Sequence, residues 1–114
     1  MNKFIYEGFA CTEANEEEVV FSRNSGEIRL ENRRDLCKFY TPMKKYTFSL
    51  IETTANVNTF LVKSFMLDKF NNFIVVLRNS NAQDSVEIKM PLDSYKNEDM
   101  ESFSIGKKYD VKIE

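Results

Sequence analysis

Hydrophobic and polar residues alternate along most of this chain, which is the pattern of β-strands with one buried face. In the run from Lys45 to Leu50, for example, Tyr46, Phe48 and Leu50 share one face. Asn-, Ser- and Gly-containing turns separate such runs, among them residues 24–26 and 79–81. The pattern predicts strands at about residues 3–11, 17–23, 27–31, 44–52, 59–67, 72–79, 85–90 and 107–113.

The chain also repeats itself with a period of about 50–60 residues. Four blocks recur in order: residues 4–9 match 60–65, 19–21 with 23–25 match 75–77 with 78–80, 27–30 match 87–90, and 44–50 match 107–113. We interpret this as an internal repeat of residues 1–52 and 59–114 joined by a linker at 53–58. Each half is a three-stranded meander, a longer connection and a fourth strand.

A four-stranded half of this size would be marginal alone, so the two halves should share one core. The predicted fold is therefore all-β, with residues 1–114 forming a single β domain. Two similar four-stranded halves would build a small pseudo-symmetric β-barrel or a sandwich, and the local pattern leaves both open. The expected core is Phe9, Val20, Ile28, Leu30, Tyr46, Phe48, Leu50, Phe65, Val76, Ile88, Tyr109, Val111 and Ile113.

The two connections, 32–43 and 91–106, are too polar and broken for long helices, although one helical turn could form at 97–102. No apolar run approaches the roughly 20 residues of a membrane span, and the first residues lack the apolar stretch of a signal peptide. We therefore expect a cytoplasmic protein without a membrane partner. Cys11 and Cys37, the two cysteines, are expected to be reduced and largely buried.

Residue types that carry chemistry are scarce. The chain has no histidine, which removes the commonest general base and metal ligand. Two carboxylate clusters, at 16–18 and 98–101, fall in predicted turns or connections and are better explained as solvated surface. With three glycines there is no phosphate-binding loop. We expect no enzyme activity, no cofactor and no metal site.

Charge is distributed unevenly, although the formal net charge is only −2. Residues 33–46 hold five basic residues against one acidic, whereas residues 1–32 hold three basic and seven acidic. Cations interleaved with aromatic rings are typical of single-strand nucleic-acid binding, where rings stack on bases. The candidate nucleic-acid-binding residues are Arg33, Arg34, Lys38, Tyr40, Lys44 and Lys45. The alternative is structural, with Tyr46 in the core and Tyr40 or Phe39 closing one end of the barrel.

Three short segments of the sequence resemble segments of a known group of proteins. They are Phe9-Ala-Cys-Thr-Glu-Ala with Glu18-Val-Val-Phe21, then Glu31-Asn32 with Lys38-Phe-Tyr-Thr-Pro42, and finally Ser102-Phe-Ser-Ile-Gly-Lys-Lys-Tyr-Asp-Val111. Together they resemble small uncharacterised proteins of tailed phages over about half of the chain. The glycine that this family shows after the Thr-Pro pair is missing here. The resemblance implies a phage origin, hence the host cytoplasm, and implies no reaction.

Three functions remain open from the sequence. The first is a non-enzymatic binding or accessory module that acts through a protein partner, because a small domain without catalytic residues works through its surface. The second is a single-stranded nucleic-acid-binding protein that uses residues 33–46. The third is a structural component of a virion.

Overall fold

The computed structural model describes residues 3–31, 38–56, 58–79, 84–95 and 103–114, and these residues form an all-β domain. The strands form one closed antiparallel barrel in the order β1-β2-β3-β7-β6-β5-β8-β4. Their bounds are β1 Lys3–Ala14, β2 Glu18–Arg23, β3 Gly26–Glu31, β4 Lys45–Glu52, β5 Phe60–Leu67, β6 Asn72–Asn79, β7 Ser85–Pro91 and β8 Lys108–Ile113. A short 3-10 turn, η2, covers Leu92–Ser94.

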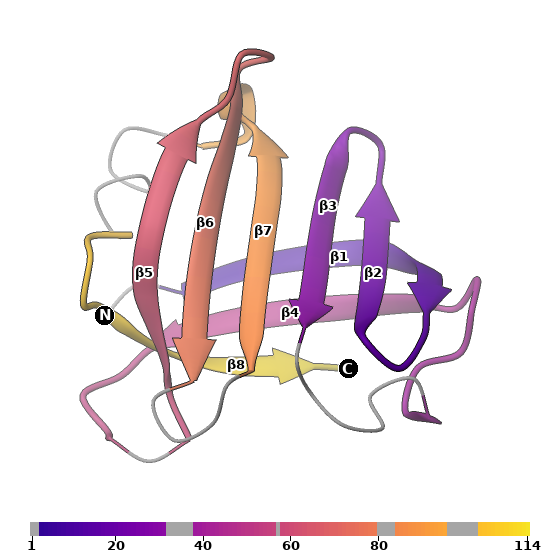
Figure 1. Ribbon diagram of the computed structural model, residues 1–114, viewed down its shortest axis with the longest axis horizontal. Helices are drawn as coiled ribbons and strands as arrows, with labels where there is room; N and C mark the ends of the chain where they lie inside the picture. The colour runs from indigo at the N-terminus through magenta and orange to yellow at the C-terminus, as the bar shows by residue number, and fades with distance from the viewer. Residues whose placement is uncertain (1–2, 32–37, 57, 80–83, 96–102) are drawn as a thin grey trace.

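The barrel is flattened into two layers that cross each other. In Figure 1, β5, β6, β7, β3 and β2 stand side by side in front, while β1, β4 and β8 run behind them in a different direction. The layers join at two corners, where β1 pairs with β2 and β5 pairs with β8. Pairing at both corners closes the sheet, so the open choice between barrel and sandwich is settled as a barrel. The eight predicted strands are confirmed to within a few residues at each end.

The strand order supports two related halves. If β1, β2, β3 and β4 are exchanged for β5, β6, β7 and β8 in turn, every strand keeps the same neighbours in the closed ring. The ring is then simply read in the opposite direction. The two halves meet in pairs of equivalent strands, β3 with β7 and β4 with β8. Each half therefore completes the sheet of the other, as a shared core requires.

One block of the repeat was aligned wrongly from the sequence. Residues 4–9 were matched to 60–65, but Phe9 faces Tyr46 on β4 just as Phe60 faces Tyr109 on β8. The structurally equivalent residues of β1 and β5 thus begin at Phe9 and Phe60. The bulges agree with this register, since β1 is irregular between Cys11 and Glu13 and β5 between Val62 and Ser64. The sequence match failed because phenylalanine recurs every five residues in both segments.

The corrected register reveals two departures from symmetry. The first half has an N-terminal extension at residues 3–8, which pairs with β4. The second half has a longer β5–β6 hairpin: Ala14 and Val19 face each other across the β1–β2 hairpin, whereas the equivalent pair is Phe65 and Val75. The equivalent positions are therefore ten residues apart in the second half rather than five. Both departures lie at the same mouth of the barrel, because residues 3–7 line a groove with the segment that follows β7, and Leu92 in that segment bonds to Asn71 in the β5–β6 turn.

The core fills the space between the layers. Nine of the predicted core residues are buried: Phe9, Val20, Ile28, Leu30, Tyr46, Phe48, Leu50, Ile88 and Tyr109. Val111 and Ile113 are half-buried and pack against this core. Val20 is buried but does not belong to the central cluster.

Two core predictions are wrong. Phe65 is 45% exposed, because it lies in the extended part of the β5–β6 hairpin. Val76 is only half-buried, while its neighbours Val75 and Leu77 are fully buried. The run Phe73–Leu77 is apolar throughout, so it carries no alternation that would identify the inner face.

Candidate binding surfaces

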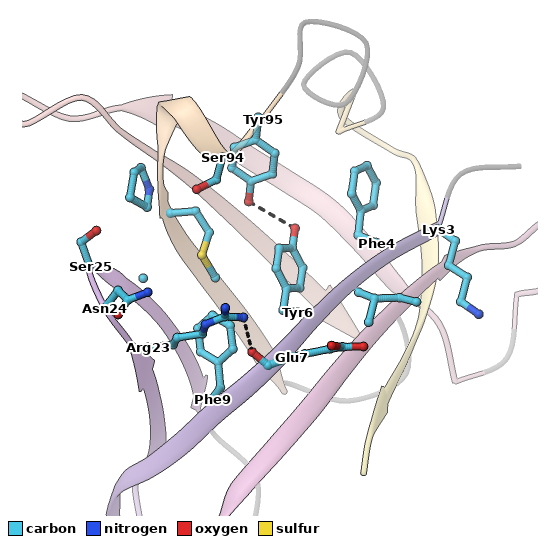
Figure 2. Close-up of a pocket in the computed structure, with 14 residues that line it drawn as sticks. Lys3, Phe4, Tyr6, Glu7, Phe9, Arg23, Asn24, Ser25, Ser94 and Tyr95 are labelled. Atoms are coloured by element: carbon cyan, nitrogen blue, oxygen red, sulfur yellow. Dashed lines mark hydrogen bonds between the residues drawn. The ribbon is translucent and has the colours of Figure 1, made fainter.

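A groove opens at one mouth of the barrel, between the N-terminal part of β1 and the ends of front-layer strands (Figure 2). Its volume is about 520 Å³. One wall is Lys3–Glu7 of β1, and the other is built by the β2–β3 turn, the end of β7 and η2. Phe9 and Met90 are buried residues that also line it. The groove thus combines an apolar base with polar groups at its rim.

Aromatic side chains close the barrel beside this groove. Tyr95 follows η2, and its hydroxyl lies 3.2 Å from that of Tyr6, a contact drawn in Figure 2. The Tyr95 ring packs edge-on against Phe73 at 5.3 Å, and Phe103 stacks on Phe4 at 4.6 Å. Because these rings come from β1, β6 and the segments around β7 and β8, they fix the groove wall against the core.

Glycine at position 8 gives β1 its shape at the groove. Gly8 has a φ of +71°, a conformation that other residues adopt only with strain. The β1–β4 register is irregular between Tyr6 and Phe9, so the strand bends there. β1 pairs with β2 only from Ala10 onward, which leaves residues 3–7 without a strand on that side among the described residues. The bend is what opens the groove.

The β5–β6 hairpin forms a second surface at this mouth. Phe65, Met66, Leu67 and Phe70 are all exposed, and Phe70 at the turn is 71% exposed. We call these four residues the apolar tip. Phe65 and Leu67 face Val75 and Phe73 across the hairpin and therefore lie on its inner face.

The turn that carries the apolar tip is built by Asp68. Its carboxylate accepts hydrogen bonds from the backbone N–H groups of Phe70 at 2.8 Å and Asn72 at 2.9 Å. The Asn72 bond is the main cause that lowers the pKa of Asp68. Asn71 takes a φ of +60°, and its carbonyl accepts the N–H of Leu92 at 2.9 Å. The exposed rings therefore stand on an ordered turn that is tied to η2.

The apolar tip was not predicted as a site. A phenylalanine between Asp68-Lys69 and Asn71-Asn72 places an aromatic ring where turn residues are expected, and this was the available signal. Lys69 lies over the Phe70 ring at 5.1 Å, so a cation accompanies the exposed aromatic.

The predicted nucleic-acid segment is only partly described. Arg33 and Arg34 lie outside the described residues. Lys38, Lys44 and Lys45 are exposed, and Lys44 lies over the Tyr46 ring at 5.5 Å.

Tyr40 has a structural role. Its half-buried ring packs edge-on against Phe21 at 5.1 Å and against Tyr46 at 5.2 Å. The Tyr46 hydroxyl in turn accepts the N–H of Thr41 at 2.9 Å. Tyr40 therefore closes a part of the core, whereas Phe39 beside it is 71% exposed.

The acidic cluster at 16–18 is organised as a turn and an ion pair. The Asn15 side-chain oxygen accepts the N–H groups of Glu17 and Glu18. The Glu18 carboxylate lies 3.3 Å from Arg29, whose other partner is Glu27 at 2.8 Å. The bond to Glu27 is the main cause that raises the pKa of Arg29. The residues 98–101 of the other cluster lie outside the described part.

Cys11 is buried and free, and burial raises the pKa of its thiol. Cys37 lies outside the described residues, as do residues 97–102, where a helical turn was predicted. Within the described ranges, no three Cys, Asp or Glu side chains gather in a way that could hold a metal ion. The same part of the chain contains no helix that is long and apolar enough to span a membrane.

Comparison with known proteins gives no relative: the chain matches no family model, no curated protein and no solved structure.

Proposed function

We propose that this protein is a non-enzymatic binding module that docks a protein partner on the apolar tip of the β5–β6 hairpin. The observation that carries the proposal is the exposure of four apolar side chains, Phe65, Met66 and Leu67 at the end of β5 and Phe70 on the ordered turn that follows. A contiguous exposed apolar surface on a small domain marks an interaction site. The equivalent β1–β2 hairpin is shorter and ends in Asn15, Glu16 and Glu17 instead. The fold therefore does not require this surface.

The charges around the apolar tip define the partner's chemistry. Lys63 and Lys69 are exposed beside it, whereas Asp68 is engaged by backbone N–H groups and lies 3.9 Å from Lys89. The exposed charges on the hairpin itself are therefore positive, whereas the exposed Asp93 lies on the neighbouring η2. A complementary partner presents an apolar pocket for Phe70 with acidic groups at its rim, where they meet Lys69.

A second candidate function is single-stranded nucleic-acid binding at the exposed residues Lys38, Phe39, Lys44 and Lys45. Its support is the exposed Phe39 ring among these cations, an arrangement suited to stacking a base beside phosphates. Tyr40 does not belong to this surface, because its ring contacts Phe21 and Tyr46. This candidate predicts binding that weakens steeply with salt.

Two matched variants separate the candidates, because Phe70 and Phe39 are equally exposed at 71%. We expect Phe70→Ser to abolish capture of a protein partner from lysate while Phe39→Ser retains it, with nuclease present in both cases. Removing either ring should leave the folding stability within about 0.5 kcal/mol of wild type, since neither is buried. A protein band that both variants retain would contradict docking on the apolar tip. Binding of a labelled oligonucleotide that Phe39→Ser loses would favour the second candidate.

A further inference from the structure

We propose that residues Lys3–Glu7 of β1 form a homodimer interface, in which the same strand of a second copy pairs antiparallel with them. This surface is distinct from the apolar tip, and the inference does not depend on the proposed function. It follows from the direction of the backbone groups of β1 and from the order of its charges.

The backbone hydrogen bonds of β4 determine which groups of β1 are free. The N–H and C=O of Thr47 bond to Glu114 beyond β8, and the N–H of Thr53 bonds to Lys108. The backbone N–H and C=O groups of odd-numbered β4 residues therefore point toward β8. Those of the even-numbered residues Phe48 and Leu50 point toward β1. Their partners in the register are Tyr6 and Phe4.

The intervening residues of β1 consequently point their backbone groups away from β4. These residues are Lys3, Ile5 and Glu7, and one direct observation supports the assignment. The Glu7 carbonyl accepts a hydrogen bond at 2.6 Å from the Arg23 side chain (Figure 2). Arg23 lies on the groove side of β1, and β4 pairs with the opposite edge. Among the described residues, no strand pairs with this edge. Unpaired N–H and C=O groups at an exposed edge are a template for another strand.

The side chains along this edge are complementary to themselves. Lys3, Ile5 and Glu7 share the outer face of β1, and all three are exposed. Antiparallel pairing centred on Ile5 places Ile5 opposite its own copy and Lys3 opposite Glu7 of the second copy. The Glu7–Lys3 pair then repeats on the other side of the axis. Opposite charges and apolar residues directly opposite each other stabilise a strand pair, and a two-fold interface requires such self-complementarity.

The environment of the edge is compatible with an incoming strand. The groove beside it has a volume of about 520 Å³ and opens to solvent. The Glu7 carbonyl has a second lone pair, so it can accept an N–H while it keeps its bond to Arg23. Each of the three facing pairs would exchange two backbone hydrogen bonds, because all three residues point toward the partner.

The test is sedimentation equilibrium of the full chain over a concentration series up to about 1 mM, which detects dimers with a Kd as high as about 1 mM. We expect a concentration-dependent dimer for the wild type. Lys3→Glu places two carboxylates opposite each other in both outer pairs, and Glu7→Lys places two ammonium groups opposite each other there. Each variant alone should weaken dimerisation by at least about tenfold. An equimolar mixture of the two should restore it, because every facing pair then has opposite charges.

Two controls keep the result specific. Lys63→Glu changes the net charge as much as Lys3→Glu does, but it lies on β5 and should leave the dimer unchanged. Ile5→Pro replaces the side chain of the central pair and removes the N–H that points away from β4 but no hydrogen bond to β4, so circular dichroism should show a folded protein while the dimer is lost. A wild type that stays monomeric throughout would overturn the proposal. So would a dimer that Lys3→Glu leaves intact, or a mixture that does not restore pairing.

Discussion

Ile28 of β3 lies directly opposite Ile88 of β7, and both side chains are fully buried. These two isoleucines occupy the same place in the two halves of the repeat. The pairs beside them are related in the same way, since Glu27 faces Lys89 and Arg29 faces Glu87. A pseudo-two-fold axis therefore passes between Ile28 and Ile88. In the other layer it passes between Ser49 and Lys112, which face each other in the β4–β8 pair.

The first prediction follows from this symmetry. Ile28→Val and Ile88→Val should each lower the free energy of unfolding by about 0.5–1.5 kcal/mol, because each removes one buried methylene from equivalent surroundings. The two losses should agree within about 0.5 kcal/mol, and the double variant should depart from their sum because the residues touch. Urea unfolding measures all three. Losses that differ by more than about 1 kcal/mol would contradict the equivalence.

Phe48 and Phe65 should respond differently to removal of the ring, although both were predicted to be core residues. Phe48 is fully buried and packs against Phe21 at 4.7 Å, so Phe48→Ala should cost about 3–5 kcal/mol. Phe65 is half-exposed in the apolar tip, and Phe65→Ala should cost about 1 kcal/mol or less. Chemical denaturation of the two variants provides the comparison, and equal losses would mean that the hairpin tip is packed in solution.

Gly8 should be required for the bend in β1. Its φ of +71° disfavours any side chain, while an added Cβ would meet no atom within 4 Å. Gly8→Ala should therefore destabilise the fold by about 1–2 kcal/mol through backbone strain alone. Gly8→Asn is the matched control, because asparagine tolerates this conformation better and should cost less. Thermal unfolding of both variants distinguishes strain from crowding, since crowding would make the larger asparagine the worse substitution.

Tyr109 should make the protein sensitive to alkali. Burial, and secondarily the charge of Glu52, raises the pKa of its phenol from 10.0 to about 12. The folded protein therefore keeps this proton where the unfolded chain has lost it. The associated stability is fully present below about pH 10 and disappears as the pH rises to about 12, a loss of about 2–3 kcal/mol at most.

Urea unfolding between about pH 9 and pH 12 measures this slope. Tyr109→Phe has no phenolic proton at that position, so its stability should fall less steeply over the same range. Parallel slopes for wild type and variant would assign the alkaline loss to other groups.

The alternation of polar and apolar residues was sufficient to predict the strands and most of the core. It was decisive where polar residues separate apolar ones, as in Tyr46, Phe48 and Leu50. It failed in the continuous apolar run around Val76, where only the sheet determines which side chains face inward. The predicted repeat was correct in the blocks that contain Ile28 and Ile88, and displaced by five residues in β1.

The groove could not be predicted, for a physical reason. Its walls are residues 3–7 on one side and residues 23–26 and 90–95 on the other, which are far apart in the sequence and come together at the bend of β1 at Gly8. A lone glycine in a strand pattern is compatible with a bulge, but it does not indicate what lies on the other side. The exposed edge of β1 depends on where β2 stops pairing, which is likewise a property of the closed barrel.

The exchange of strands between the halves also affects synthesis on the ribosome. When residues 1–52 have emerged, β3 and β4 lack the partners β7 and β8 that complete both layers. The first half therefore keeps two open sheet edges until the rest of the chain is made, which takes several seconds at about 5–20 residues per second. Neighbouring nascent chains on one messenger present the same two edges, so translation speed beyond residue 52 controls how long they are available to each other.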